Sequence, residues 1–358
     1  MQIDPVAYLE WAKLHKRRRI NLSPSGTADR TFDELGFDPA LLKITGPNAY
    51  GHPDLLGALG SRYGVPEDNV FTMAGASQAI FMVCAALLGK GDRVLVEKPA
   101  YEPLLSLPRL LGAEVVRLER RFDEGYGVDP VRYSDALACR PKLVVLTNLH
   151  NPSGVRLSED AHRSLCSKAG EAGAMVFIDE IYLEFAAGGP RTTAFGLGDN
   201  VITASSLTKV YGLSGLRCGW VFAPRPVISA LRKLADHLYV EGVHIAEQLS
   251  AAAFSRLDAW AAENRPRFEK NLDLVREFVR GEPNLSWVEP DSGIIAFPRI
   301  EAAADGSRLA ALLEEKYDTT VVPGRFFEEP RHFRLGFGGP PGLLAEGLEN
   351  IRRALAEF

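Results

Sequence analysis

The sequence predicts an α/β protein with a large domain around a mostly parallel, doubly wound sheet and a smaller α+β domain formed by both chain ends. One observation is that short strand-like runs alternate with helical patterns, which is typical of parallel sheets. Another is a long helical stretch followed by a separate group of short strands and helices. We place the large domain at 46–255, and the small domain with an N-terminal arm at 1–45 and 256–358.

Five runs rich in apolar and β-branched residues are expected to form the sheet. They are 93–97, 114–119, 142–148, 175–180 and 201–206. Between them, 158–173 is expected to be a helix, with Ser158 as its cap and Gly173 as its stop. Because ligands of such sheets bind where strands end, we expect the functional site at the carboxyl ends of these strands.

The second group of elements follows a helical stretch expected from Asp236 to about Val279. Strand-like runs LSWVEPDSGIIAFPRI, TTVVPG and HFRLGFG come next, with helices expected near 307–317 and from about 341. The glycine-rich stretch 186–200 is expected to be a loop.

The charge balance argues against a nucleic-acid or membrane-surface partner. The chain of 358 residues has 41 basic and 46 acidic side chains, a net charge of −5, and 46% hydrophobic residues, enough for a sizeable core. A basic run near the start contains Lys13, Lys16 and 17–19. Because Trp11 and Leu14 are interleaved with it, it suits a helix with a solvated charged face better than a nucleic-acid arm.

Neither an export signal nor a membrane span is expected. The first residues are acidic and polar where a signal peptide needs a basic flank and an apolar stretch. The longest apolar run, 80–88, is far shorter than the roughly 20 residues that cross a bilayer. The cysteines are scattered without a Cys/His cluster, so no metal site is predicted. A cytoplasmic enzyme is therefore expected.

The segment SLTKVYGLSGLRCG places Lys209 between two groups that can bind an anion, Ser206 and Arg217. A free lysine, with a pKa near ~10.4, is a poor nucleophile at neutral pH, so a catalytic lysine usually forms an imine with an aldehyde. A phosphorylated aldehyde would need both flanking groups. Taken by itself, a surface lysine beside a loop is about as good an interpretation.

Three rival motifs fail for lack of their companion elements. Ser206 as the nucleophile of a penicillin-binding-type acyl enzyme requires Ser-Asp-Asn and Lys-Thr-Gly, and neither tripeptide occurs. Asp179 as the acidic strand end of a P-loop ATPase requires a phosphate-binding loop that is also missing. A dinucleotide site at the glycines of 336–342 would come too late in the chain for a complete βαβ unit.

Seven motifs occur in order along nearly the whole chain. They are GASQAI (75–80), PAY (99–101), HNPSG (150–154), DEIY (179–182), SLTK (206–209), GLRCG (215–219) and FRLGF (333–337). Together they resemble the fold type I pyridoxal-phosphate enzymes, specifically the class I/II aminotransferases. The resemblance implies a pyridoxal 5'-phosphate cofactor, transamination of an L-amino acid with a 2-oxo acid, and a homodimer with shared active sites.

The resemblance also assigns the catalytic residues. Lys209 would carry the cofactor as an aldimine and, once freed by the substrate's amine, move the proton of the α-carbon. Asp179 would hold the proton on the pyridine nitrogen, which makes the ring an electron sink. Tyr182 and Asn151 would donate hydrogen bonds to the phenolate oxygen, and Asn151 is expected to contact the substrate as well.

The phosphate is expected at the start of the helix that follows Gly75. The first amides of a helix lack partners, so Ala76, Ser77 and Gln78 can hold an anion there, although Ser77 alone could be a simple helix cap. Arg217 would add a charge-assisted pair and Ser206 a hydroxyl.

Four further positions complete the expected site. Tyr101 matches the aromatic that stacks on the cofactor ring, and Arg334 matches the arginine that grips the substrate carboxylate, with Arg331 as a competing candidate. Gly26 would add a backbone donor to the same carboxylate. Tyr50 resembles the tyrosine that reaches the phosphate of the neighbouring subunit, which implies the homodimer.

Two other functions stay open. The same motifs serve carbon–sulfur β-lyases, amino-acid decarboxylases and other elimination enzymes of this fold. A non-catalytic cofactor-binding regulator is less well supported, because the segment before Tyr50 is short and shows no helix-turn-helix pattern. The stretch 147–150 lacks the repeated Asn-Pro of many members, and no second arginine that would mark a dicarboxylic substrate is identified. His150 is expected to pack near the cofactor without acting as a base.

Overall fold

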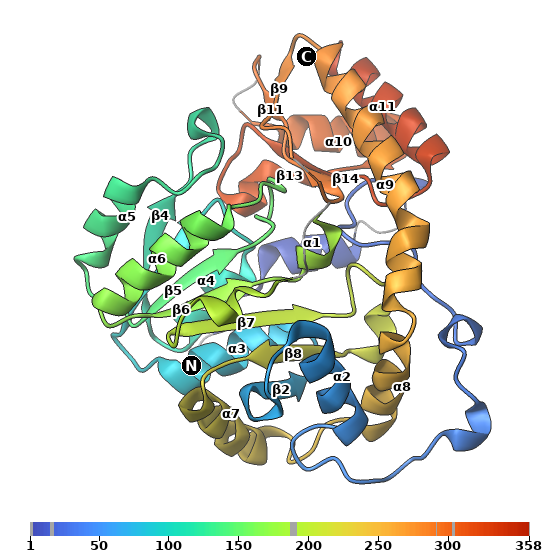
Figure 1. Cartoon of the computed structure of the whole chain (residues 1–358). Helices are drawn as coiled ribbons and strands as arrows, with labels where there is room; N and C mark the ends of the chain where they lie inside the picture. Colours follow the sequence, from blue (N-terminus) through green and yellow to red (C-terminus); the bar gives the residue numbers. More distant parts are fainter. Residues whose placement is uncertain (1–2, 15–17, 187–191, 291, 303–304, 358) are drawn as a thin grey trace.

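The centre of the molecule is a seven-stranded sheet (Figure 1). The computed structural model describes residues 3–14, 18–186, 192–290, 292–302 and 305–357. In spatial order the strands are β2 (Val70–Met73), β8 (Gly219–Phe222), β7 (Val201–Ser206), β6 (Met175–Asp179), β5 (Leu143–Thr147), β3 (Arg93–Lys98) and β4 (Glu114–Glu119).

Most of the sheet is parallel. The neighbours from β7 to β4 run in one direction, and β8 runs antiparallel to both β7 and β2. The five strands expected from the sequence are confirmed to within one or two residues. Strands β2 and β8 were not predicted. Each has only four residues and lies beside a glycine-rich motif, so its hydrophobic run is too short to stand out.

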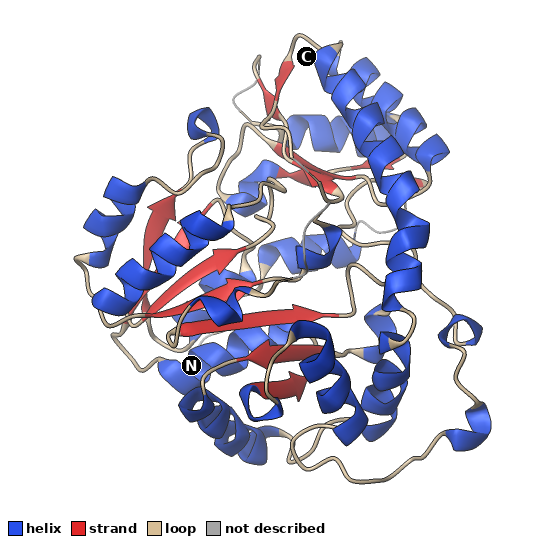
Figure 2. Ribbon diagram, viewed as in Figure 1, coloured by secondary structure: helices blue, strands red, loops and turns tan. Residues whose placement is uncertain are grey.

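Helices cover both faces of the sheet (Figure 2). Alternate residues of each strand point to opposite faces, so Val145 packs in one core cluster and Val144 in another. The Val145 face is covered by α3 (Ala76–Leu87), α4 (Pro103–Leu110) and α7 (Arg225–Leu238). The Val144 face is covered by α5 (Pro130–Leu137) and α6 (Glu159–Glu171). This two-sided burial explains why the parallel strands are apolar throughout.

The helix expected at 158–173 is confirmed as α6. The Ser158 hydroxyl accepts a hydrogen bond from the Ala161 amide at 3.1 Å, as an N-cap should. The stretch 186–200 is not a plain loop, because Ala194–Leu197 form a 3-10 turn, and 187–191 lie outside the described residues.

The helical stretch expected from Asp236 to Val279 is interrupted twice, so that expectation was wrong in part. Helix α7 ends at Leu238, α8 spans His244–Phe254, and α9 spans Leu257–Arg280. The first break contains Val240, which has a positive φ of 62° that a helix cannot contain. Helix α9 then runs from the large sheet to the second group of strands.

Both chain ends contribute to the second group, as predicted. Strand β1 (Ile20–Asn21) pairs in parallel with β12 (Thr319–Thr320). The other elements are β9 (Leu285–Ser286), β10 (Ile295–Ala296), β11 (Arg299–Ile300), α10 (Ser307–Lys316), β13 (Val322–Pro323), β14 (Phe333–Gly336) and α11 (Pro341–Leu355). Near the N-terminus lie α1 (Ala7–Leu14) and α2 (Pro53–Tyr63). The division at 46–255 stays our proposal for the domain limits.

The basic run near the N-terminus is only partly described, since Lys16 and Arg17 lie outside the described residues. Lys13 lies in the last turn of α1, and Arg19 forms an ion pair with Glu346 of α11. Among the helices that the structure describes, none has the length and apolar character needed to cross a membrane.

Candidate active site

The expected catalytic residues meet where strands β5, β6 and β7 end. Asp179 is the last residue of β6, and its register partners are Thr147 at the end of β5 and Ala204 in β7. Lys209 follows the end of β7, and its positive charge acts on the Asp179 carboxylate. Asn151 lies in the turn after β5. The parallel strands thus bring together side chains that are far apart in the sequence.

Asp179 is buried, and burial raises the pKa of its carboxyl group to about 7. A hydrogen bond of 3.1 Å from the Ile181 amide opposes the rise, the charge of Glu97 adds to it, and the charge of Lys209 opposes it. A buried carboxylate that holds its proton near neutral pH is well suited to sharing one with a heterocyclic nitrogen.

A fully buried ion pair supports the strand ends that carry these residues. Glu97 accepts from Arg120 at 2.6 Å and from the Thr147 hydroxyl. The Thr147 hydroxyl oxygen in turn accepts from the Asn151 amide at 3.1 Å. Burial raises the pKa of Glu97 despite the charge of Arg120. Glu97 was not predicted from the sequence. Its signal was a carboxylate at the end of the otherwise apolar run RVLVE.

Arg334 projects from β14 into the same site and is buried. Its guanidinium donates to the Asn151 side-chain oxygen at 3.1 Å, to the Tyr8 hydroxyl at 2.7 Å and to the Ser23 carbonyl at 3.1 Å. The competing candidate, Arg331, has a side chain that is 46% exposed and donates to the Glu301 carbonyl at 3.0 Å. The structure therefore favours Arg334 as the inward-facing arginine.

Tyr8 was also missed by the sequence analysis. Its ring lies 5.3 Å from the Arg334 guanidinium, and its hydroxyl accepts from that group. The Ala7 and Tyr8 amides donate to the Glu102 carboxylate at 3.0 and 2.6 Å, which holds the start of α1 against the site. The isolated helix carries no motif, so only the fold reveals this contact.

Two tyrosines lie near the carboxylate. Burial raises the pKa of Tyr182 to about 12, while the charge of Arg334 and a hydrogen bond with Ser25 oppose the rise. Burial also raises the pKa of Tyr101. The ring of Tyr101 lies edge-on to Tyr8 with 5.8 Å between centroids, and its hydroxyl is hydrogen-bonded with Ser77. Both phenols keep their protons at neutral pH and can donate.

The start of α3 and Arg217 form a cradle. Gly75, just before the helix, has a φ of 85°, and a Cβ built there would lie 2.5 Å from Arg217 Nη2. Arg217 also donates to the Ala74 carbonyl at 3.2 Å, which aims its cation at the helix start. Ser77 lies in the first turn, and the Ala76 and Ser77 amides precede the first bond of that turn, in which the Gln78 amide donates to the Gly75 carbonyl at 3.1 Å. This arrangement is typical of an anion site.

The remaining predicted residues differ in how close they come to this site. A Cβ on Gly26 would lie 3.7 Å from Lys209 Cδ, so Gly26 packs on the lysine. The Ser206 oxygen accepts from the Thr208 amide at 3.2 Å, and the Gln78 side chain accepts from the Ala74 amide. Tyr50 is exposed, and its hydroxyl donates to Asp236 at 3.3 Å.

His150 is enclosed by its own hydrogen bonds. Its ring nitrogens lie 2.6 Å from the Ser153 hydroxyl and 3.0 Å from the Pro99 carbonyl. Burial and then the charge of Arg120 hold the pKa of this imidazole well below its usual range. A neutral, fully bonded ring packs in the core and is unsuited to act as a base. No group of three or more His, Cys, Asp or Glu among the described residues could hold a metal ion.

The comparison with known proteins agrees with this geometry. The family profile for aminotransferase class I and II matches residues 43–351. The chain belongs to that family. It is therefore a pyridoxal-phosphate-dependent aminotransferase of fold type I, in agreement with the seven motifs.

Several relatives of this aminotransferase carry different names. Capreomycidine synthase of Streptomyces vinaceus is 30% identical, with 99% of this chain and 95% of that protein covered. An aspartate aminotransferase of Streptomyces avermitilis is 27% identical over 86% of this chain and 81% of that one. A solved aminotransferase from Streptococcus suis matches with a TM-score of 0.93 and 25% identity, covering 100% and 99%. The solved cyclase OrfR matches with a TM-score of 0.88 and 28% identity, covering 100% and 98%.

The residues of this aminotransferase fit the cofactor that the family requires. The buried Asp179 matches a protonated ring nitrogen, and the cradle at Gly75, which a Cβ would fill, matches a phosphate. Tyr182 supplies a phenol and Lys209 an amine beside them. The donor set is thus complementary to a phosphorylated pyridine aldehyde.

Proposed function

We propose that Lys209 binds pyridoxal phosphate covalently and serves as the base in transamination between an L-amino acid and a 2-oxo acid. When bound, the cofactor supplies an electron sink for the pair left on the substrate's α-carbon. The observation that carries the proposal is the meeting of Lys209, Asp179 and Asn151 at one sheet edge with Arg334.

Proton movement is assigned to two groups. Lys209 Nζ, once freed by the substrate's amine, would move the proton from the substrate's α-carbon to the cofactor's aldehyde carbon. Asp179, whose carboxylate is buried, would keep the ring nitrogen of the cofactor protonated. Tyr182 and Asn151 hold the ring oxygen. Because the Asn151 oxygen already accepts from Arg334, its NH₂ group is the donor.

Orientation is assigned to the remaining side chains. Arg334 binds the substrate carboxylate with its planar fork, with the Gly26 amide and the Asn151 side chain beside it. Tyr101 stacks on the cofactor ring, which excludes water from that face. The phosphate lies at the helix start, held by the group Ala76, Ser77, Gln78, Ser206 and Arg217.

A homodimer is part of the proposal, with Tyr50 reaching the phosphate of the partner subunit. Tyr50 is exposed on this chain, where its ring lies 5.1 Å from the Arg232 guanidinium. Such a surface tyrosine is free to meet a second copy. Mixing inactive Tyr50→Ala and Lys209→Ala chains tests the sharing. Recovery of roughly a quarter of the wild-type activity per site supports it, whereas no recovery contradicts it.

A second candidate is ring closure on an amino acid at the same site. It is favoured by the similarity to capreomycidine synthase and to the cyclase OrfR. The two functions leave different products. Transamination releases a 2-oxo acid and leaves the amine on the cofactor, whereas ring closure keeps the nitrogen in the product. Mass spectrometry of a single turnover distinguishes them.

The test of the main proposal is an absorbance spectrum of the purified protein with and without a panel of amino acids that includes aspartate and arginine. We expect a visible band that Lys209→Ala loses and that the exposed control Lys43→Ala keeps. Addition of the right amino acid should bleach the band and release one equivalent of 2-oxo acid. A wild-type protein with no such band after addition of pyridoxal phosphate would contradict the proposal.

A further inference from the structure

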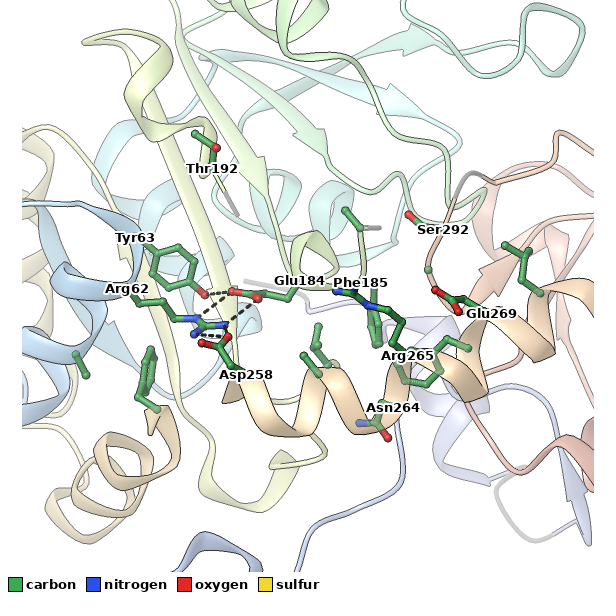
Figure 3. Close-up of a pocket in the computed structure, with 18 of the residues that line it drawn as sticks. Arg62, Tyr63, Glu184, Phe185, Thr192, Asp258, Asn264, Arg265, Glu269 and Ser292 are labelled. Atoms are coloured by element: carbon green, nitrogen blue, oxygen red, sulfur yellow. Dashed lines mark hydrogen bonds and ion pairs between the residues drawn. The ribbon is translucent and has the colours of Figure 1, made fainter. Parts of the chain in front are cut away.

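A half-buried arginine outside the cofactor site joins several segments. Helix α2 begins at Pro53 and is stopped by Gly64, so Arg62 lies in its last turn. The Arg62 guanidinium donates to both carboxylate oxygens of Glu184, with Nε at 3.2 Å and Nη2 at 3.1 Å (Figure 3). This is the bidentate geometry in which arginine binds a carboxylate most firmly.

The same guanidinium has two further partners. Nη2 donates to the Tyr211 hydroxyl at 3.1 Å, and Nη1 donates to Asp258 at the start of α9 at 3.2 Å. The Tyr63 hydroxyl donates to Glu184 at 2.8 Å. The Arg62 side chain is 10% exposed and that of Glu184 only 4%, so this pair is largely shielded from water, whereas the Asp258 side chain is 73% exposed.

The partners of Arg62 stand next to the catalytic residues. Glu184 follows Tyr182 by two positions, and Tyr211 follows Lys209 by two positions. We propose that Arg62 is a positioning residue that fixes the lysine-bearing and tyrosine-bearing loops relative to each other. This inference rests on the roles given to Lys209 and Tyr182 in the proposed function.

The Glu184 loop borders a cavity on one side. Arg62, Glu184 and Phe185 line a cavity of about 850 Å³ that reaches Phe268 of α9 (Figure 3). Leu183 and Phe185 are buried, and the Phe185 ring packs edge-on against Phe268 at 5.4 Å, so packing and the ion pair together fix the position of the loop. Burial disfavours the charge of Arg62, but Tyr211 and Glu184 keep the pKa of the guanidinium above its ordinary value. The cation is therefore present at any pH at which the enzyme folds.

Lysine cannot replace the planar guanidinium group of Arg62. An ammonium is a point charge without the planar pair of donors, so Arg62→Lys keeps the charge but loses the fixed geometry. Arg30 provides a matched control. Its side chain is also 10% exposed, its ion-pair partners are Glu34 at 2.6 Å and Glu263 of α9 at 3.2 Å, and its guanidinium lies 5.2 Å from the Trp260 ring.

The experiment compares Arg62→Met, Arg62→Lys and Arg30→Met as holoenzymes. We measure the pH midpoint of the visible cofactor band, kcat and KM for the amino acid, and the melting temperature. For Arg62→Met we expect a shifted midpoint and a kcat lower by roughly tenfold or more, with KM within about twofold. Arg62→Lys should recover part of the loss. Arg30→Met should lower the melting temperature alone.

If Arg62→Met fails to fold, two variants that each lack one tyrosine hydroxyl test the role of Arg62 instead. Tyr211→Phe removes the link to the lysine loop, whereas Tyr63→Phe leaves Arg62 bound to both loops. We expect only Tyr211→Phe to shift the midpoint. Equal effects of the two deletions, or an Arg62→Met enzyme with wild-type kcat and midpoint, would overturn the inference. A wild-type band that does not depend on Lys209 would instead overturn the proposed function.

Discussion

Arg334 and Asn151 are hydrogen-bonded across 3.1 Å, and this bond joins β14 of the second group of strands to the turn after β5 of the large sheet. The residue assigned to the substrate carboxylate therefore contacts a residue assigned to the cofactor. A substrate that binds the Arg334 fork also changes the surroundings of the Asn151 amide. With the roles proposed for these two residues, this bond would couple substrate binding to the electronics of the cofactor.

Replacing Arg334 by lysine should weaken substrate binding far more than the same change at Arg331. Lysine keeps a charge but loses the bidentate fork, and in this buried position the Asn151 and Tyr8 contacts are lost with it. We expect KM for the amino acid to rise by roughly 100-fold, equal to about 2.7 kcal/mol. Arg331→Lys, with its exposed side chain, should leave KM within about twofold. Steady-state kinetics of both variants provide the test, and equal KM values would contradict the assignment.

The pKa of Asp179 predicts a pH dependence of stability in the cofactor-free protein. Because the folded pKa of about 7 lies above the ordinary 3.8, the folded state holds a proton that the unfolded state has lost between those values. Stability therefore falls as pH rises from about 4 to 7, by up to about 4 kcal/mol. Asp179→Asn should flatten this slope in urea denaturation measured at several pH values.

Glu180 is the control for that measurement. Burial raises its pKa to about 7 as well, but its carboxylate accepts from Thr193 and the Ala194 amide, away from the ring position. Glu180→Gln should flatten the slope to a similar degree. Pyridoxal phosphate should abolish the contribution of Asp179 by supplying a cationic partner, and leave that of Glu180. If the pH dependence of stability that comes from Asp179 persists in the holoenzyme, the proposed pairing of Asp179 with the ring nitrogen of the cofactor is wrong.

Glu97→Gln should destabilise the fold by about 3–5 kcal/mol, because it removes one partner of a buried ion pair and leaves Arg120 without its counter-charge. The comparison is Glu119→Gln, which removes an exposed carboxylate at the end of β4 that pairs with Lys98 at 3.6 Å. That change should cost less than about 1 kcal/mol. The free energies of unfolding of both variants, measured by denaturant titration, test this prediction. Similar values for the two variants would contradict a structural role of the Glu97–Arg120 pair.

Gly75→Ala should weaken cofactor binding by at least about tenfold, because its Cβ would lie 2.5 Å from Arg217 Nη2 and push the cation away from the helix start. Gly91→Ala is a matched control. Gly91 has a similar φ of 81°, but a Cβ there meets nothing within 4 Å. Both substitutions place a side chain at a positive φ, and a larger loss of cofactor affinity at Gly75, measured as Kd by fluorescence titration, reports the contact with Arg217. Equal Kd values would place the phosphate elsewhere.

The sequence predicted those features of the fold that depend on interactions within one short segment. The strand runs and the Ser158 cap follow from burial and from unpaired amides within one segment. The motif residues were predicted from their position after strand-like runs and from the resemblance of the sequence to the aminotransferases. Tyr8 was not, because its partner Arg334 lies 326 positions away and only the fold joins them. Glu97 and Arg62 were missed likewise, since their partners are fixed by strand register and by the packing of α2.

The pairing of Ile20 with Thr319 has a consequence for synthesis on the ribosome. The partner strand of β1 is translated only when most of the chain has already emerged. The large sheet, whose neighbours from β7 to β4 lie within one continuous stretch, can be completed first. The N-terminal segment must then wait unpaired, with its apolar Ile20 and Leu22 accessible to chaperones, until the last tenth of the protein is made.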